Sequence, residues 1–173
     1  MNTLKMTLKE LNNLPEYEAL KQFSICCGTF KWVEQMGNSR PFQNKNELLK
    51  MAEKIWFSLS GQDWLEAFSH HPKIGDIESL RSKFQKTAKL SEFEQKGISH
   101  VSENILREIE KGNQLYENNF GYIFIVCATG KTAEEMLVLI NERLKNDPEA
   151  ELLIAANEQN KITRLRLEKL FDL

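Results

Sequence analysis

Apolar residues recur along most of this chain at the three- and four-residue spacing of amphipathic helices. The clearest stripe lies in residues 46–59, and a second lies in residues 98–109. The same pattern predicts helices in residues 8–11, 16–27, 64–70, 76–84, 91–119 and 136–144, and a last helix that begins at Pro148. Trp32 and Val33 are expected in a short turn, followed by a loop over residues 37–41.

Capping signals mark where several of these helices begin. Thr7 precedes the first helix, and Thr132 is followed by Glu135 at the spacing of a capping box. Asp147 stands before Pro148 as an N-cap, with acidic residues in the next turn. The last helix is expected to turn its apolar residues inward: Leu152, Ala155, Ala156, Ile162 and Leu165.

One segment, Gly121 to Gly130, departs from the helical pattern. Its aromatic and β-branched residues between two glycines predict an extended backbone. No second strand is predicted, so the N–H and C=O groups of this segment need other partners, and a ligand is one candidate.

Composition agrees with a helical fold. Eight Gly and four Pro make 12 of 173 residues, about 7%, where about 12% is usual. We therefore predict an all-α, single compact multi-helix domain over residues 1–173, with one short extended segment near 121–130. With 23 basic and 25 acidic residues the net charge is −2, which excludes a general attraction to nucleic acid or anionic lipid.

The cysteine count bears on the compartment. The chain has three cysteines, two of them adjacent at Cys26 and Cys27, which favours a reducing environment. The first 13 residues have no continuous apolar stretch, and the longest apolar run, residues 122–128, is too short to cross a bilayer. We therefore expect a cytoplasmic protein without a membrane partner.

Three familiar kinds of site are disfavoured. Gly130-Lys131-Thr132 follows an extended segment, but position 125 is Ile125 where a phosphate-binding loop has glycine. The cysteines stand in apolar or late-helix positions that do not favour a thiolate. The adjacent His70 and His71 lack the i, i+4 spacing of metal ligands, so no metal is expected.

His71 is the strongest candidate for acid–base chemistry. Because Pro72 follows it, His71 is expected at or just past the end of a helix, and its pKa lies near neutrality. An exposed loop histidine is the plainer interpretation. Ser91, Glu94 and Gln95 fit either a polar site or a helix cap, and Arg164 and Arg166 fit either a carboxylate clamp or a solvated face.

Four segments together carry a family resemblance: HPKIG at 71–75, SEFEQKG at 91–97, FGYIFIVCATGKTAEEML at 120–137, and RLKNDPEAEL through KITRLRLEKL at 143–170. In this order they resemble the 2-oxo-4-hydroxy-4-carboxy-5-ureidoimidazoline (OHCU) decarboxylases, over nearly the whole chain. The resemblance implies an all-α fold, a homodimer without metal or organic cofactor, and decarboxylation of OHCU to (S)-allantoin and CO2 in urate degradation.

The resemblance also implies roles for residues. His71 matches the family's catalytic histidine, and Glu94 is the second catalytic residue, which orients or assists it. Arg166, preferred over Arg164, would bind the substrate carboxylate. The remaining predicted substrate-binding residues are Pro72, Ser91, Glu92, Phe93, Gln95, Phe124, Ile125, Val126, Cys127 and Ala128.

The residue types suit this chemistry. The substrate's own carbonyl and ring nitrogens can delocalise the electrons that decarboxylation leaves, so the protein needs only proton transfer and anion binding. Two other classes stay open: an enzyme acting on a different ureide in the same fold, and a non-catalytic helical interaction module. A polar pocket at His71 would favour an enzyme. An exposed apolar stripe would favour the non-catalytic interaction module.

Overall fold

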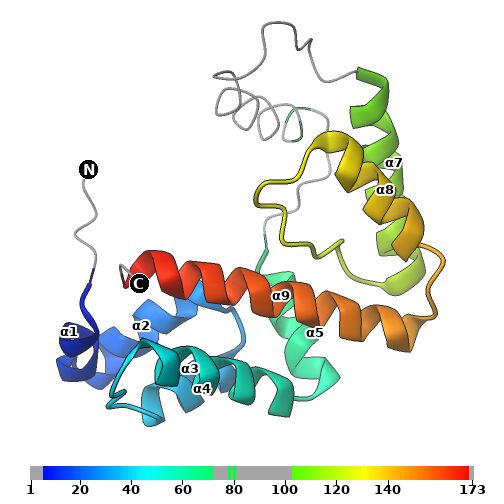
Figure 1. Cartoon of the computed structure of the whole chain (residues 1–173). Helices are drawn as coiled ribbons and strands as arrows, with labels where there is room; N and C mark the ends of the chain where they lie inside the picture. The colour runs from blue at the N-terminus through cyan, green and yellow to red at the C-terminus, as the bar shows by residue number, and fades with distance from the viewer. Residues whose placement is uncertain (1–5, 72–77, 79, 81–102, 172–173) are drawn as a thin grey trace, which may run out of the picture. The chain divides into compact units, whose positions relative to one another are not determined.

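A computed structural model describes residues 6–71, 78, 80 and 103–171 (Figure 1). Their regular secondary structure is helical, and these residues include no strand, which confirms the predicted all-α class. The helices are α1 (Leu8–Asn13), α2 (Glu16–Cys26), α3 (Phe30–Asn38), α4 (Lys45–Ser58), α5 (Gly61–Ser69), α7 (Glu103–Phe120), α8 (Ala133–Arg143) and α9 (Pro148–Leu170).

The chain divides into two compact units. Unit 1 comprises residues 1–71 and 155–173, and unit 2 comprises residues 72–154. The boundary falls within α9, between Ile154 and Ala155. The single domain over residues 1–173 stays a prediction.

Predicted helix starts are confirmed at several points. Thr7 forms a capping box with Glu10, and Thr132 forms one with Glu135. The Asp147 side chain accepts hydrogen bonds from the backbone N–H groups of residues 149 and 150, each at 3.1 Å, at the start of α9. The capping box that starts α5, between Ser60 and Asp63, lies three residues earlier than predicted.

Two predictions about local structure are wrong. The expected turn at Trp32 and Val33 is the helix α3, which also includes Gly37 and Asn38 of the expected loop. The apolar residues of α3 recur at helical spacing over only nine residues, and Gly28 before the helix and Gly37 within it made this short pattern hard to recognise.

The inward face of α9 also differs from the prediction. Ala155 and Ala156 are buried, but Leu152, Ile162 and Leu165 are only half-buried. Buried residues follow one another on α9 at a spacing of four: Glu151, Ala155, Gln159, Thr163 and Leu167. Three of these five side chains are polar.

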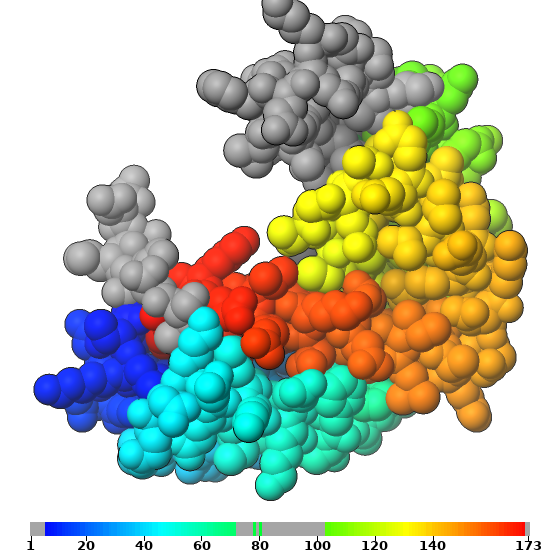
Figure 2. Space-filling view, viewed as in Figure 1, coloured from blue at the N-terminus to red at the C-terminus, as the bar shows by residue number. Residues whose placement is uncertain are grey.

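Aromatic side chains form the core of unit 1. Phe23 packs edge-to-face on Trp32 and on Phe42, with ring centroids 6.1 and 6.3 Å apart. Trp56 donates its indole N–H to the carbonyl of Ala156 at 2.8 Å, which fixes α4 against α9. In Figure 2 the red C-terminal part of α9 lies next to the blue and cyan surface of unit 1.

The core of unit 2 lies between α7 and α8. Its buried residues are Leu80, Leu106, Ile109, Ala133, Met136 and Ile140. The segment that joins the two helices contributes Phe124, Val126 and Ala128, which pack against this cluster. The core therefore holds the one long non-helical connection of the described part of unit 2 in place.

Candidate active site

His71 stands immediately beyond the end of α5. The helix ends at Ser69, His70 is its C-cap, and the backbone N–H of His71 donates to the carbonyl of Phe68 at 3.1 Å. This placement confirms the position expected from the following proline. A Cβ atom on Gly28 would lie 2.5 Å from the Cβ of His70, so the turn depends on a glycine at its back.

The imidazole of His71 is half-buried among polar groups from α9. Its Nε2 forms a short hydrogen bond with Oε1 of Gln159. Burial lowers the pKa of His71 from its ordinary value of 6.5, the Gln159 hydrogen bond opposes this shift, and the electrostatic effects of Arg166 and His70 add to it. The side chain is therefore neutral at pH 7 and ready to accept a proton.

Arg166 and Arg164 occupy different environments. The half-buried Arg166 donates from Nη1 to the carbonyl of Cys26 at 3.2 Å, and its charge acts on His71. The Arg164 side chain is 58% exposed and pairs with Glu168, with Nε and Oε1 3.3 Å apart. A guanidinium has five N–H donors, so Arg166 retains capacity for an anion beside the imidazole.

The adjacent cysteines contact this part of the site through the Cys26 carbonyl, which accepts the hydrogen bond from Arg166. Cys26 and Cys27 are fully buried, and burial raises the pKa of Cys26 to about 12 and that of Cys27 to about 11. Both are protonated at neutral pH and cannot act as nucleophiles as they stand. This agrees with core packing as the interpretation of these two cysteines.

Residues 121–130 form the connection between α7 and α8 in unit 2, where an extended segment was predicted. Gly121 and Gly130 have φ of +78° and +77°, values that favour glycine, and residues 123–128 have no regular secondary structure. Because the segment pairs with no described strand, its polar groups need other partners. The carbonyl of Ile125 accepts a hydrogen bond from Nη1 of Arg143 at 2.7 Å.

Arg143 belongs to a buried cluster that the sequence did not reveal. Its guanidinium binds Glu151 through Nε at 2.8 Å and Nη2 at 2.6 Å. Tyr116 donates a short hydrogen bond to the same carboxylate, and Asn146 donates to its other oxygen at 2.7 Å. The guanidinium also lies 4.5 Å from the ring centroid of Phe124. Burial and the Glu151 hydrogen bond raise the pKa of Tyr116, which stays protonated.

The structure thus brings some predicted site residues together and does not describe others. His71 and Arg166 both lie in unit 1, where the charge of Arg166 acts on His71, and Phe124, Ile125, Val126, Cys127 and Ala128 share the connection between α7 and α8 in unit 2. Glu94 and the remaining predicted substrate-binding residues lie outside the described residues: Pro72, Ser91, Glu92, Phe93 and Gln95. Their roles stay predictions.

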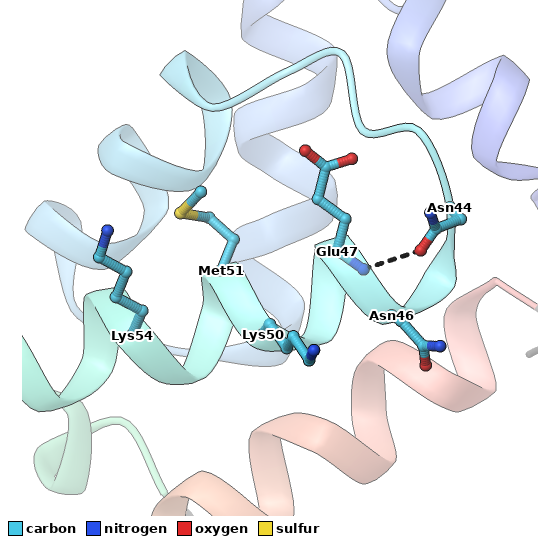
Figure 3. A pocket seen from close by; sticks show the side chains of 6 residues that line it. All are labelled: Asn44, Asn46, Glu47, Lys50, Met51 and Lys54. Carbon is cyan, nitrogen blue, oxygen red and sulfur yellow. Dashed lines mark hydrogen bonds between the residues drawn. The ribbon is translucent and has the colours of Figure 1, made fainter.

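Two other observations limit the kinds of site. The described ranges contain no group of three or more His, Cys, Asp or Glu residues placed to hold a metal ion. An open pocket of about 400 Å³ lies along α4, lined by Asn44, Asn46, Glu47, Lys50, Met51 and Lys54 (Figure 3). It includes none of the predicted site residues, and Figure 3 shows its six lining side chains, with Asn44 accepting a hydrogen bond from the backbone N–H of Glu47 at the start of the helix.

The sequence of this chain matches a known protein family. The sequence profile described as OHCU decarboxylase matches residues 12–168. The chain belongs to the OHCU decarboxylase family. The resemblance seen in the four sequence segments is thereby confirmed, and the extent of the match covers both units.

Individual relatives agree with this assignment. The chain is 44% identical over 155 residues to the uric acid degradation bifunctional protein TTL of Arabidopsis thaliana, covering 87% of this chain and 47% of that protein. It is 26% identical over 170 residues to the 2-oxo-4-hydroxy-4-carboxy-5-ureidoimidazoline decarboxylase of Amia calva, covering 96% of this chain and 95% of that one. The chain thus spans about half the length of the bifunctional Arabidopsis relative.

Solved structures show the same fold. A crystal structure of OHCU decarboxylase determined in the presence of (S)-allantoin has a TM-score of 0.72 and 40% identity, covering 88% of this chain and 98% of that one. A crystal structure of (S)-allantoin synthase has a TM-score of 0.71 at 18% identity, covering 96% of this chain and 55% of that one, and so supports the fold alone.

Two residues were missed in the sequence: Gln159, which forms a hydrogen bond with His71, and Thr163, which accepts one from Gln159. Both are polar, and the prediction of the inward face of α9 considered only apolar residues. The four-residue spacing that joins Ala155 to Leu167 passes through both positions, and this was the available signal.

No described helix is long and apolar enough to cross a bilayer.

Proposed function

We propose that this protein catalyses the cofactor-independent decarboxylation of OHCU to (S)-allantoin and CO2, as a carboxy-lyase of urate degradation. The observation that supports this most is the neutral, half-buried imidazole of His71 beside the cationic Arg166, in a chain of the OHCU decarboxylase family. The reaction requires a base for proton transfer and a group that binds the substrate carboxylate.

In the proposed reaction Arg166 binds the substrate carboxylate through charge-assisted hydrogen bonds. The bond between the ring carbon and this carboxylate breaks, CO2 leaves, and the electron pair enters the conjugated carbonyl and ring nitrogen system. His71 takes the proton of the substrate hydroxyl and returns a proton to one face of the ring, forming the new C–H bond. Delivery from one side gives one enantiomer.

Glu94 would orient His71 or assist the transfer, since a carboxylate beside an imidazole favours its charged form. Ser91, Gln95 and the segment 124–128 would shape the pocket around the ureido and ring amides. These roles rest on the family motif and the residue types.

The test uses freshly generated OHCU and follows (S)-allantoin by circular dichroism. The wild-type protein should accelerate its formation, and His71→Gln should be slower by about 10²–10⁴-fold, because it removes the acid–base group. His70→Gln is the matched control, since this neighbouring side chain is exposed, and it should keep most of the rate.

An unchanged rate in His71→Gln, or no acceleration by the wild type, would contradict the proposal. Turnover of a related ureide in place of OHCU would indicate a different enzyme of the same fold. Absence of saturable allantoin binding together with absence of turnover would indicate an interaction module.

We also propose that the protein is a cytoplasmic homodimer. The dimer is the family's usual state, and light scattering of the full chain tests it by mass. The cytoplasmic assignment is supported by the three free cysteines, two of them fully buried as protonated thiols. Localisation of a tagged full-length protein tests it.

A further inference from the structure

Gln159 is a buried amide whose two ends are both engaged. It lies on α9 with no exposed surface, its Oε1 meets Nε2 of His71, and its Nε2 donates to Oγ1 of Thr163 at 3.1 Å. Thr163 is itself 3% exposed. A buried amide held at both ends has one fixed orientation, because each end needs its complementary partner.

The geometry of the two ends sets the direction of these hydrogen bonds. The amide nitrogen of Gln159 can only donate, so the Thr163 oxygen is its acceptor, and Thr163 also forms a hydrogen bond with the Cys27 side chain. The Gln159 carbonyl oxygen then faces the imidazole.

A carbonyl oxygen can only accept a hydrogen bond, so the ring nitrogen that meets it must carry the proton. An amide turned the other way would present an N–H group to His71 and require an unprotonated Nε2. The two orientations therefore predict opposite neutral tautomers of His71. This makes the arrangement open to direct measurement.

We propose that Gln159 is a positioning residue for the proton transfer: it holds neutral His71 as the Nε2–H tautomer, so that Nδ1 carries the lone pair that receives the substrate proton. This rests on the proposed function. When Nδ1 takes the proton, the Nε2–H group keeps its acceptor, and the imidazolium is stabilised by the same carbonyl. On return of the proton the original tautomer is restored.

A neutral acceptor at this position has a distinct effect from a carboxylate. A carboxylate in place of this amide would favour the imidazolium and raise the pKa of His71, in addition to any effect of Glu94. The amide orients the ring without adding a negative charge. His70 and Arg166 are the described charged or titratable groups that act on the ring, and both oppose its protonation.

The first test measures the tautomer in the full-length protein. Long-range ¹H–¹⁵N correlation at pH 8 reports which ring nitrogen is protonated in each of the three histidines, and His71→Gln identifies the signal by its loss. A single Nε2–H form with a slowly exchanging ring proton is expected. A protonated Nδ1 with bare Nε2 would overturn the proposal.

Two substitutions extend the test to turnover. Gln159→Met removes the acceptor at similar volume and should lower kcat by about 10–100-fold with little change in KM, together with loss of the slowly exchanging proton. Gln159→Glu keeps the acceptor, so it should retain the Nε2–H form and move the acid limb of the kcat profile to higher pH. Gln35→Met, on the exposed face of α3, is the matched control and should change neither.

A merely structural role gives a different result. Both Gln159 variants would then lose stability, while the tautomer and the pH profile would stay as in the wild type, and this outcome would overturn the proposal. Wild-type turnover is scored separately. A protein that shows the Nε2–H tautomer but does not decarboxylate OHCU would refute the proposed function and leave the tautomer assignment standing.

Discussion

Helix α9 carries two buried polar clusters, one in each unit, and they differ in charge. The first joins Glu151 to Arg143 and Tyr116, and the second joins Gln159 and Thr163 to His71. The first contains a full ion pair, with Glu151 completely buried. The second consists of neutral side chains, with the cation of Arg166 beside it.

This difference indicates that the Arg143–Glu151 cluster supports the fold, whereas the His71–Gln159 cluster belongs to the proposed active site. Arg143 uses Nε, Nη1 and Nη2 on protein acceptors and is 6% exposed, so the cluster is complete without a ligand. His71 and Arg166 are only half-buried and retain polar capacity. Burial of charge alone is thus a poor guide to function in this protein, and incomplete satisfaction next to partial exposure is the better one.

The largest effect should come from breaking the scaffold. Glu151→Ala leaves the Arg143 guanidinium buried without its counter-charge and should lower the free energy of unfolding by about 3–5 kcal/mol. Urea denaturation followed by circular dichroism measures it. The control is Glu108→Ala, which removes an exposed pair with Lys111 and should cost about 1 kcal/mol or less. Equal losses in the two variants would contradict the distinction.

Next in size is the effect of removing the cation of the site. Arg166→Gln should lower kcat/KM for OHCU by about 10–100-fold, because it deletes charge-assisted hydrogen bonds to the carboxylate. Arg164→Gln keeps Arg166 and removes only the exposed pair with Glu168, so it should stay near the wild type. The reverse order of effects would assign the carboxylate to Arg164.

A smaller effect is expected behind the histidine turn. Gly28→Ala places a methyl group 2.5 Å from the Cβ of His70, near the root of that side chain, and should cost about 1–3 kcal/mol of stability and reduce turnover. Gly37→Ala is the control, because its methyl meets only the Cδ2 tip of Leu20 at the same 2.5 Å. Thermal unfolding and turnover should separate the two, and a harmless Gly28→Ala would show that the turn tolerates movement.

The smallest effect concerns pH. Because the pKa of His71 is lowered in the folded protein, the unfolded chain binds more protons between that pKa and 6.5. Stability should therefore fall as the pH drops from about 6.5 toward the folded pKa, by at most about 1.4 kcal/mol per pH unit for one proton. His71→Gln should flatten this part of the urea-midpoint profile, and an unchanged profile would contradict the neutral imidazole.

The sequence predicted the helices that carry strong local signals and the position of His71 after α5. Capping boxes and an apolar stripe are properties of adjacent residues, so they can be found in the sequence alone. The partners of His71 could not, because Gln159 is 88 residues away and becomes a neighbour only through folding. The Ile125–Arg143 contact shows the same limit: an unpaired extended segment was foreseen, but its partner was not.

The thiol of Cys27 stands at the far end of the hydrogen bonds that begin at His71. Its rate of alkylation can therefore report how often the surrounding structure opens. A fully buried thiol with a pKa of about 11 reacts with an alkylating agent only when the surrounding helices separate. Its labelling rate therefore counts the openings of unit 1. A bound ligand that slows this labelling would report, without any measurement of turnover, that the site and the packing beneath it open as one.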